Sequence, residues 1–348
     1  MTTSEGRTSR RSFIREAGML IGGGMASAVT GCATGAAAHG GESVRFCAFA
    51  DIHYCQNGYW PNGNYEWLDR ILRRGTEAKS DFIVSLGDMS FDPVKDRAYI
   101  AHYLDYAPTK TYYIYGNHEF GERTFEEIAP VCRVPVGHYH WDCRGFRFIA
   151  LDPHYRVKDG KVLRFERRCS HPDENGMCFC VPPEQVAWLR ETLDASPYPC
   201  VVMAHERFDD RHGLVSNHAE IRQAFNDANA KCPGKVRLVI NGHHHKNYLR
   251  VLDGIPYFDL NSASYDIERD HKAYPEEFRR RCGSAKYILT WNDPLSAIIT
   301  LTRDGGLRIE GSRSSFYLGV TPEMAKWKGE WGRETQAEVL SADLKFNY

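Results

Sequence analysis

Apolar residues in the first two thirds of the chain form short runs that alternate with longer amphipathic stretches. Short apolar runs that end in polar residues are typical of strands buried on both faces. Stretches whose apolar residues recur every three to four positions indicate helices packed on one side. The expected strands are 44–50, 81–86, 111–115, 199–204 and 236–240. The expected helices are 64–78, 93–105, one that begins at Pro182, and one that Ser216 or Asn217 caps. This alternation favours an α/β fold.

The remaining segments are richer in strands. HYHWDC and FRFIALD flank a short turn with the alternation of a hairpin. Residues 247–311 are expected as short strands joined by turns, 156–181 as an insertion or long loop, and 319–348 as a C-terminal tail. Together the patterns predict a main domain over 44–318 in which sheets pack together with helices outside.

The first 31 residues have the layout of an export signal. Arg10-Arg11 precede a weakly apolar, Gly- and Ala-rich stretch that is shorter than the ~20 residues of a membrane-spanning helix. The paired arginines resemble a twin-arginine signal. Residues 29–32, Val-Thr-Gly-Cys, resemble a bacterial lipoprotein processing site, so we expect a lipid on Cys32 and a flexible tether over 32–43. The alternative is ordinary cleavage in the Ala-rich stretch with loss of Cys32. In both cases the protein is expected to be periplasmic or on the cell surface. The only expected contact with the membrane is the possible lipid anchor.

Composition narrows the function classes. A net charge of −1 and a pI of about 6.9 give no electrostatic reason to expect nucleic-acid binding, which usually needs a basic domain or stripe. Ten cysteines follow Cys32, and an exported protein can form disulfides. The densest group lacks a standard zinc spacing, so disulfides or free thiols are expected there, with a structural zinc site as the alternative. This group is Cys169, His171, Cys178 and Cys180.

Residues that can bind metals follow five of the expected strands. Because sites in α/β sheets lie at the carboxyl ends of strands, we expect these residues to meet at one edge of the fold. Carboxylates, imidazoles and an amide oxygen suit borderline divalent metals such as Mn, Fe, Zn or Co. No cysteine stands at these strand ends, which argues against a closed structural zinc site. The residues are Asp51, His53, Asp88, Asn117, His118, His205, His243 and His245.

The run of three histidines needs separate treatment, because a histidine tract can also bind metal loosely on its own. In an extended segment alternate side chains share a face. His243 and His245 are therefore expected to enter the site together, as are Asp51 and His53. His244 is expected to point away from it.

The ordered series D-x-H, G-D, G-N-H-E, a lone His and G-H-x-H resembles the calcineurin-like metallophosphoesterase family, over about residues 44–260. The resemblance implies a four-layer α/β/β/α sandwich that holds two adjacent metal ions. It implies Asp51, His53 and His245 as ligands of the first ion, Asn117, His205 and His243 as ligands of the second, and Asp88 as the bridge. It also implies that His118 meets the leaving group as general acid, and that Glu119 orients His118 or its loop.

The implied chemistry is attack on phosphorus by a hydroxide that the two metals activate, with His118 protonating the leaving oxygen. The substrate would be a small phosphorylated molecule, and monoester, diester and pyrophosphate linkages all stay open. One rival is a metal-dependent amidohydrolase, which typically has H-x-H at the first strand, unlike Asp51-Ile52-His53. The other is a non-catalytic metal-binding surface lipoprotein, which has no need of His118.

Two positions depart from the family pattern. Many members carry an aspartate, three residues after the bridging one, that partners the catalytic histidine; here Phe91 stands there and Asp92 follows. The lone His205 is followed by Glu-Arg rather than lying in G-H-x-P. Arg207 either contacts the substrate phosphate or is a solvated loop charge. His154 follows a strand end and either lines the pocket or has a structural role.

Overall fold

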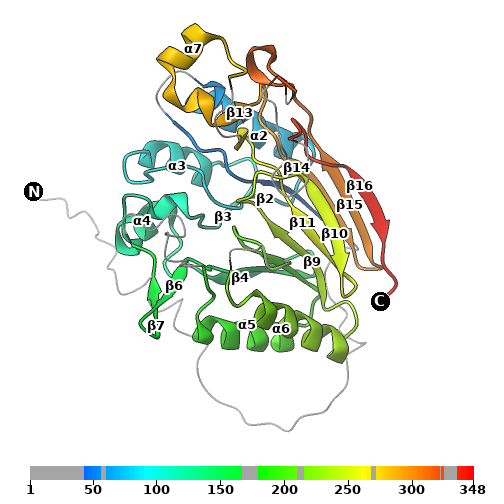
Figure 1. Ribbon diagram of the computed structural model, residues 1–348. Coiled ribbons are helices and arrows are strands. Elements are labelled where there is room, and N and C mark those ends of the chain that lie inside the picture. Colours follow the sequence, from blue (N-terminus) through cyan, green and yellow to red (C-terminus); the bar gives the residue numbers. More distant parts are fainter. Residues whose placement is uncertain are drawn as a thin grey trace, which may run out of the picture. The chain divides into compact units, whose positions relative to one another are not determined.

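Two six-stranded mixed sheets lie at the centre of the fold (Figure 1). The computed structural model describes residues 43–55, 60–166, 179–209, 215–267, 272–321, 323–324 and 335–348, all within the unit Ala37–Tyr348. The first sheet has the order β16 (Ala342–Lys345), β15 (Gly306–Gly311), β14 (Ala297–Thr302), β1 (Ser43–Phe49), β2 (Phe82–Ser85) and β3 (Thr111–Tyr113). The second has the order β10 (Tyr248–Leu252), β11 (Ile255–Asp259), β9 (Val236–Asn241), β8 (Cys200–Met203), β5 (Phe146–Ala150) and β4 (Tyr139–Cys143).

Within each sheet the inner strands run parallel, and this sets where their ends meet. β1, β2 and β3 are parallel neighbours, as are β5, β8, β9 and β11. The antiparallel pairs in these sheets are β1 with β14, β14 with β15, β15 with β16, β4 with β5, and β10 with β11. The carboxyl ends of β1, β2, β3, β8 and β9 carry every strand-end motif found in the sequence.

Helices cover the outer faces of the two sheets. α2 (Tyr65–Glu77) and α3 (Arg97–Leu104) contact the first sheet, with α4 (Phe125–Cys132) beside α3; α5 (Pro183–Ala195) and α6 (His218–Lys231) lie together under the second (Figure 1). The order helix, sheet, sheet, helix is the predicted four-layer sandwich. None of the helices in the described ranges is long and apolar enough to cross a bilayer.

Smaller elements decorate these layers. The hairpins are β6 (Tyr155–Lys158) with β7 (Lys161–Arg164), and β12 (Tyr265–Ile267) with β13 (Ile288–Thr290). The short helices are α7 (Glu276–Arg281), η1 (Pro61–Gly63), η2 (His118–Phe120), η3 (Gly283–Lys286) and η4 (Tyr317–Gly319).

The two largest apolar clusters lie on opposite faces of the central strands, which explains why those strands have continuous apolar sequences. Phe46 of β1 packs between the sheets, with ring centroids 5.0 Å from Phe82 and 5.4 Å from Phe148. The alternate residues Cys47 and Phe49 point the other way, into the cluster beneath the helices. A strand buried on both faces leaves no polar alternation to read.

The structure differs from the sequence-based expectations in three places. The tail 319–348 contributes β16, which pairs antiparallel with β15 at the sheet edge. Within 247–311, α7 interrupts the expected strands. Asn217 precedes α6, but its side-chain oxygen accepts from the Val181 backbone N–H instead of capping the helix, and its amide donates to Glu220.

Candidate metal centre

Side chains from the carboxyl ends of both sheets meet in one cluster. The Nε2 atom of His245 lies 3.2 Å from the Oδ1 atom of Asp51 and 3.2 Å from the Nε2 atom of His53. The ligand atoms of these three residues all lie within 4.8 Å of one another, and all three side chains are buried. This is the set that the sequence assigns to one metal ion.

A second cluster lies beside the first. Asp88, His205 and His243 also bring their ligand atoms within 4.8 Å of one another. The Nδ1 atom of His243 lies 2.9 Å from the Oδ1 atom of Asn117, which adds the amide to this group. The Asp88 Oδ2 atom is 3.1 Å from His205 Nε2 and 3.7 Å from His53 Nε2. Asp88 therefore stands between the two clusters.

The hydrogen bonds of the ring nitrogens show that these groups suit cations. His245 Nδ1 lies 2.7 Å from the Tyr265 carbonyl and His205 Nδ1 lies 2.7 Å from the Leu86 carbonyl. A carbonyl only accepts, so each Nδ1 carries a proton and Nε2 is the ring nitrogen that faces the cluster. The buried Asp51 Oδ1 atom, 3.2 Å from His245 Nε2, has no hydrogen-bond partner among the described residues. Buried acceptors that converge in this way are costly unless a cation lies between them.

The pKa shifts of the clustered histidines also fit a metal site. Burial lowers the pKa of His205, but the carboxylates of Asp88 and Asp51 outweigh burial and hold that pKa well above its ordinary value. Burial holds the pKa of His53 and of His243 well below the ordinary value, so both rings are neutral. Neutral imidazoles beside carboxylates form a site for a metal ion, whose binding would displace the His205 proton.

Most of the candidate ligands sit on unusual backbone. Residues other than glycine rarely adopt positive φ, and such conformations concentrate at functional sites. The φ angles are 55° at Asp51, 46° at His53, 54° at Asp88, 70° at His243 and 52° at His245. The expectation that alternation along extended strands brings these pairs together is therefore wrong: left-handed residues after β1, β2 and β9 aim these side chains.

Glycines in the motifs allow the turns to pack closely. A Cβ atom on Gly116 would lie 2.2 Å from Asp88 Oδ1, and one on Gly242 would lie 2.6 Å from Asp51 Oδ2. Gly87 has a φ of +104°, which side-chain-bearing residues avoid. The backbone at Gly116 and Gly242 thus approaches a carboxylate too closely for a side chain, and Gly87 is required by its positive φ.

Glu119 holds two of the loops together. Its buried carboxylate accepts from the backbone N–H groups of Asp88 at 3.1 Å, Met89 at 2.8 Å and Gly116 at 2.7 Å, and from the Tyr113 hydroxyl at 2.8 Å. Burial and the nearby Asp88 charge raise the pKa of Glu119 to about 7. Glu119 therefore fixes the Asp88 loop against the loop that carries Asn117 and His118.

A sequence comparison identifies the family of the chain. The sequence model of the calcineurin-like phosphoesterase family matches residues 44–247. The chain belongs to this family. Membership makes it a phosphoester hydrolase, and the clustered Asp and His residues fit the dimetal dependence of the family.

This phosphoesterase resembles solved structures at low sequence identity. A dimetal phosphatase from Danio rerio is 15% identical, with a TM-score of 0.51 over 77% of this chain and 95% of its own. The anchor protein of the inner membrane complex of Plasmodium is 13% identical, with a TM-score of 0.49 over 88% of this chain and 89% of its own. No curated protein sequence matches the chain.

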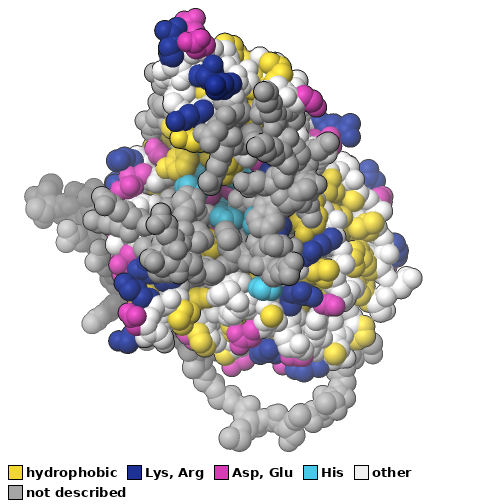
Figure 2. Space-filling model, in the orientation of Figure 1, with side chains coloured by type: hydrophobic (Ala, Val, Ile, Leu, Met, Phe, Trp, Pro, Cys, Tyr) yellow, Lys and Arg dark blue, Asp and Glu magenta, His cyan; other side chains and the backbone are white. Residues whose placement is uncertain are grey.

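His118 lies beside both clusters of the phosphoesterase. Its Nε2 atom is 3.9 Å from Asp88 Oδ2, and its backbone N–H donates to Asp88 Oδ1 at 2.8 Å. Its side chain is 22% exposed, so solvent reaches it. Figure 2 shows histidine side chains near the middle of the face in view. Asp92 is held elsewhere, because its two carboxylate oxygens accept from Arg123 at 2.8 and 2.9 Å.

His244 and Arg207 lie outside the two clusters. His244 turns toward Asp259, with 3.9 Å between Nδ1 and Oδ2, as the sequence led us to expect. Arg207 is only 4% exposed and forms ion pairs with Asp209 at 3.3 Å and Asp259 at 3.4 Å. The interpretation of Arg207 as a solvated loop charge is therefore wrong. The partner Asp259 gave no sequence signal, because it lies 52 positions away on β11.

His154 belongs to a buried charge network behind the phosphoesterase centre. Its Nδ1 atom lies 2.6 Å from Asp152 and its Nε2 atom 3.0 Å from Glu206, and none of the three is exposed by more than 1%. Burial lowers the pKa of His154, but the two carboxylates outweigh burial and raise it to about 9. His154 has a structural place and does not line a pocket.

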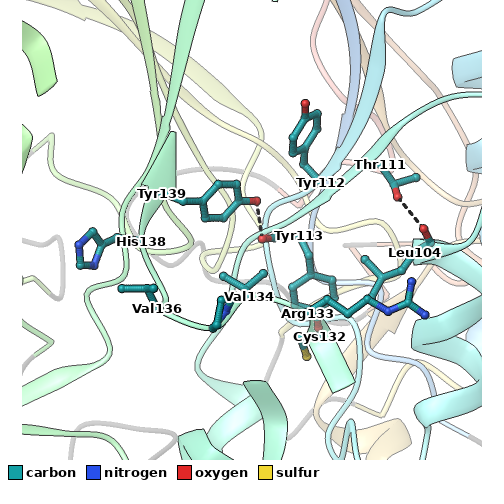
Figure 3. Close-up of a pocket in the computed structure, with 11 residues that line it drawn as sticks. Leu104, Thr111, Tyr112, Tyr113, Cys132, Arg133, Val134, Val136, His138 and Tyr139 are labelled. Atoms are coloured by element: carbon teal, nitrogen blue, oxygen red, sulfur yellow. Dashed lines mark hydrogen bonds between the residues drawn. The ribbon is translucent and has the colours of Figure 1, made fainter. Parts of the chain in front are cut away.

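A cavity of about 420 Å³ lies apart from these residues (Figure 3). It opens where the edge strands β3 and β4 approach the ends of α3 and α4, and the Tyr139 hydroxyl donates to the Tyr113 carbonyl across it. Its lining is mainly aromatic and aliphatic and includes none of the candidate ligands. The cavity lacks the groups that phosphoester hydrolysis needs.

The described residues include only some of the cysteines for which disulfides or free thiols were expected. Cys47, Cys132, Cys200 and Cys282 lie buried with free thiols. Cys169, His171 and Cys178 lie outside the described residues, as do the export signal and Cys32.

Proposed function

We propose that this phosphoesterase is an exported enzyme that hydrolyses a phosphate ester or a nucleotide-type phosphoanhydride of a small molecule at a centre of two divalent metal ions. One observation carries the proposal: two buried groups of metal ligands lie side by side and share Asp88 as their link. Two such ions could clamp the attacking and leaving oxygens of an in-line displacement and supply hydroxide near neutral pH.

In this proposal each cluster holds one ion. Asp51, His53 and His245 would hold the first ion, Asn117, His205 and His243 would hold the second, and Asp88 would contribute to both. Imidazole, carboxylate and amide ligands without cysteine fit Mn, Fe, Zn or Co. The carbonyls that accept from His205 and His245 set the tautomer that leaves Nε2 free to bind.

His118 acts on the leaving group. Its Nε2 atom faces the centre and would donate a proton to the departing oxygen. The hydrogen bond from its backbone to Asp88 fixes this ring relative to the bridging carboxylate. His118 also lies within 4.8 Å of the ligand atoms of His53 and Asp88, so a ligand role is the alternative that must be tested.

A substrate panel on the metal-loaded protein tests the function. Phosphate monoesters, diesters and pyrophosphates are assayed with the Mn-loaded wild type, His118→Asn and a metal-free control. We expect His118→Asn to lower kcat about 100-fold or more while both metal ions stay bound. Loss of metal from His118→Asn would identify His118 as a ligand. No turnover of any phosphoester with both sites filled would favour a metal-binding role without catalysis.

Export rests on the N-terminal motifs. We propose that residues 1–31 are a twin-arginine signal and that Cys32 carries the lipid anchor. Mass spectrometry of the membrane-associated protein should give an N-terminus at a lipidated Cys32, and Cys32→Ser should release the protein from the membrane. An unmodified N-terminus beyond residue 32 would contradict the lipid anchor.

A further inference from the structure

Phe91 is an exposed aromatic residue in an otherwise buried loop. The residues immediately before and after it, Ser90 and Asp92, are buried, as are Asp88 and Met89, whereas Phe91 is 39% exposed. It belongs to none of the apolar core clusters of the described residues. Since an isolated Phe side chain stabilises the fold mainly by burial, its exposure here calls for another role.

The Phe91 ring lies directly against the proposed metal centre. Its centroid is 5.0 Å from the His53 ring at an interplanar angle of 25°, and Tyr265 also stacks on His53, at 5.0 Å and 26°. His53 therefore stacks with two aromatic rings, of which Phe91 is 39% exposed. Because Phe91 uses one face to stack on His53, its other face is the one that can serve a ligand.

Phe91 also borders the position of the leaving group. Its centroid lies 5.0 Å from the His118 ring, with the two rings nearly perpendicular at 89°. If His118 donates its Nε2 proton to the departing oxygen, the group attached to that oxygen emerges beside Phe91. A flat apolar face at this place offers stacking to a flat leaving group.

We propose that Phe91 is a specificity-determining residue, whose outer face stacks on an aromatic ring of the leaving group. The substrate class is a phosphoester in which an aromatic ring is attached to the scissile oxygen directly or through one carbon. This inference rests on the proposed function, because it uses the role of His118 to place the leaving group.

Binding of two matched phosphonates tests the proposal independently of turnover. Benzylphosphonate and cyclohexylmethylphosphonate resist hydrolysis and differ only in whether the ring is flat and aromatic. Titration calorimetry on the full Mn-loaded chain should show about three- to tenfold tighter binding of the benzyl compound, the range expected for aromatic stacking. The ratio of kcat/KM for benzyl and cyclohexylmethyl phosphate should show the same preference wherever a monoester is cleaved.

Variants separate stacking from simple support of His53. Phe91→Leu keeps an apolar cover on His53 but removes the flat face, so the benzyl preference should fall to within twofold while the metal content stays at the wild-type value. Phe91→Trp should keep or increase the preference. The proposal is overturned if the wild type shows no preference, if Phe91→Leu keeps it, or if Phe91→Leu weakens both phosphonates equally. A benzyl preference in binding without turnover of any phosphoester would instead sink the proposed function alone.

Discussion

Replacing Glu119 by Gln tests how the centre is held in place. Each carboxylate oxygen accepts from two donors: Oε1 from Met89 N–H and the Tyr113 hydroxyl, and Oε2 from the N–H groups of Asp88 and Gly116. A glutamine has only one acceptor atom, so either orientation of its amide leaves at least one buried backbone N–H facing a donor. Although glutamine has nearly the same shape as glutamate, we therefore expect Glu119→Gln to destabilise the protein.

The magnitude follows from the one or two buried N–H groups that lose their acceptor. Leaving a buried donor unsatisfied costs about 1–3 kcal/mol, so Glu119→Gln should lower the free energy of unfolding by about 1–6 kcal/mol. Because the Asp88 loop is the element released, metal affinity should fall about 10- to 100-fold. Denaturant unfolding of the metal-free protein and calorimetric titration with Mn, both at pH 8 where Glu119 is ionised, measure the two effects.

A neighbouring exposed glutamate supplies the control. Glu122→Gln makes the same chemical change at an exposed position of the same loop and should shift unfolding by less than about 0.5 kcal/mol. If Glu119→Gln changes the free energy of unfolding by less than about 0.5 kcal/mol and binds Mn like the wild type, the idea that Glu119 holds the two loops together is refuted.

Two further predictions follow from the histidines. His243→Ala and His245→Ala should each remove metal and activity, whereas His244→Ala should keep both, as measured by metal analysis and turnover; equal damage from all three would contradict the assignment. The raised pKa of His154, about 9 against an ordinary 6.5, means that the folded state holds a proton that the unfolded state releases. This stabilisation is complete below about pH 6.5 and is lost as the pH rises through about 9, a change of about 3 kcal/mol. Unfolding of wild type and His154→Gln across this range should show that the difference between them shrinks; a constant difference would contradict it.

The sequence predicts the layers and the membership of the site well, for a physical reason. Continuous apolar runs such as 44–50 are what a strand buried on both faces requires, and the carboxyl ends of parallel strands meet at one edge. The residues that follow those strands, such as Asp51 and His205, are therefore brought together whatever the loops do in detail.

Other features could not be predicted because the local sequence pattern does not determine them. Side-chain periodicity carries no information on the φ angle after a strand end, so the left-handed turn at His243 could not be read from alternation. The burial of Arg207 depends on Asp259 from a different strand. β16 is a four-residue edge strand with charged residues on its outer side, too short for a clear pattern.

Electron paramagnetic resonance of the protein titrated with Mn²⁺ tests the central claim most directly, because it distinguishes isolated ions from a bridged pair. Two ions that share the Asp88 carboxylate should give a magnetically coupled spectrum when about two Mn are bound per chain. Asp88→Ala should abolish that coupled signal. A spectrum of isolated ions at full occupancy, or saturation at one Mn per chain, would contradict the dimetal centre.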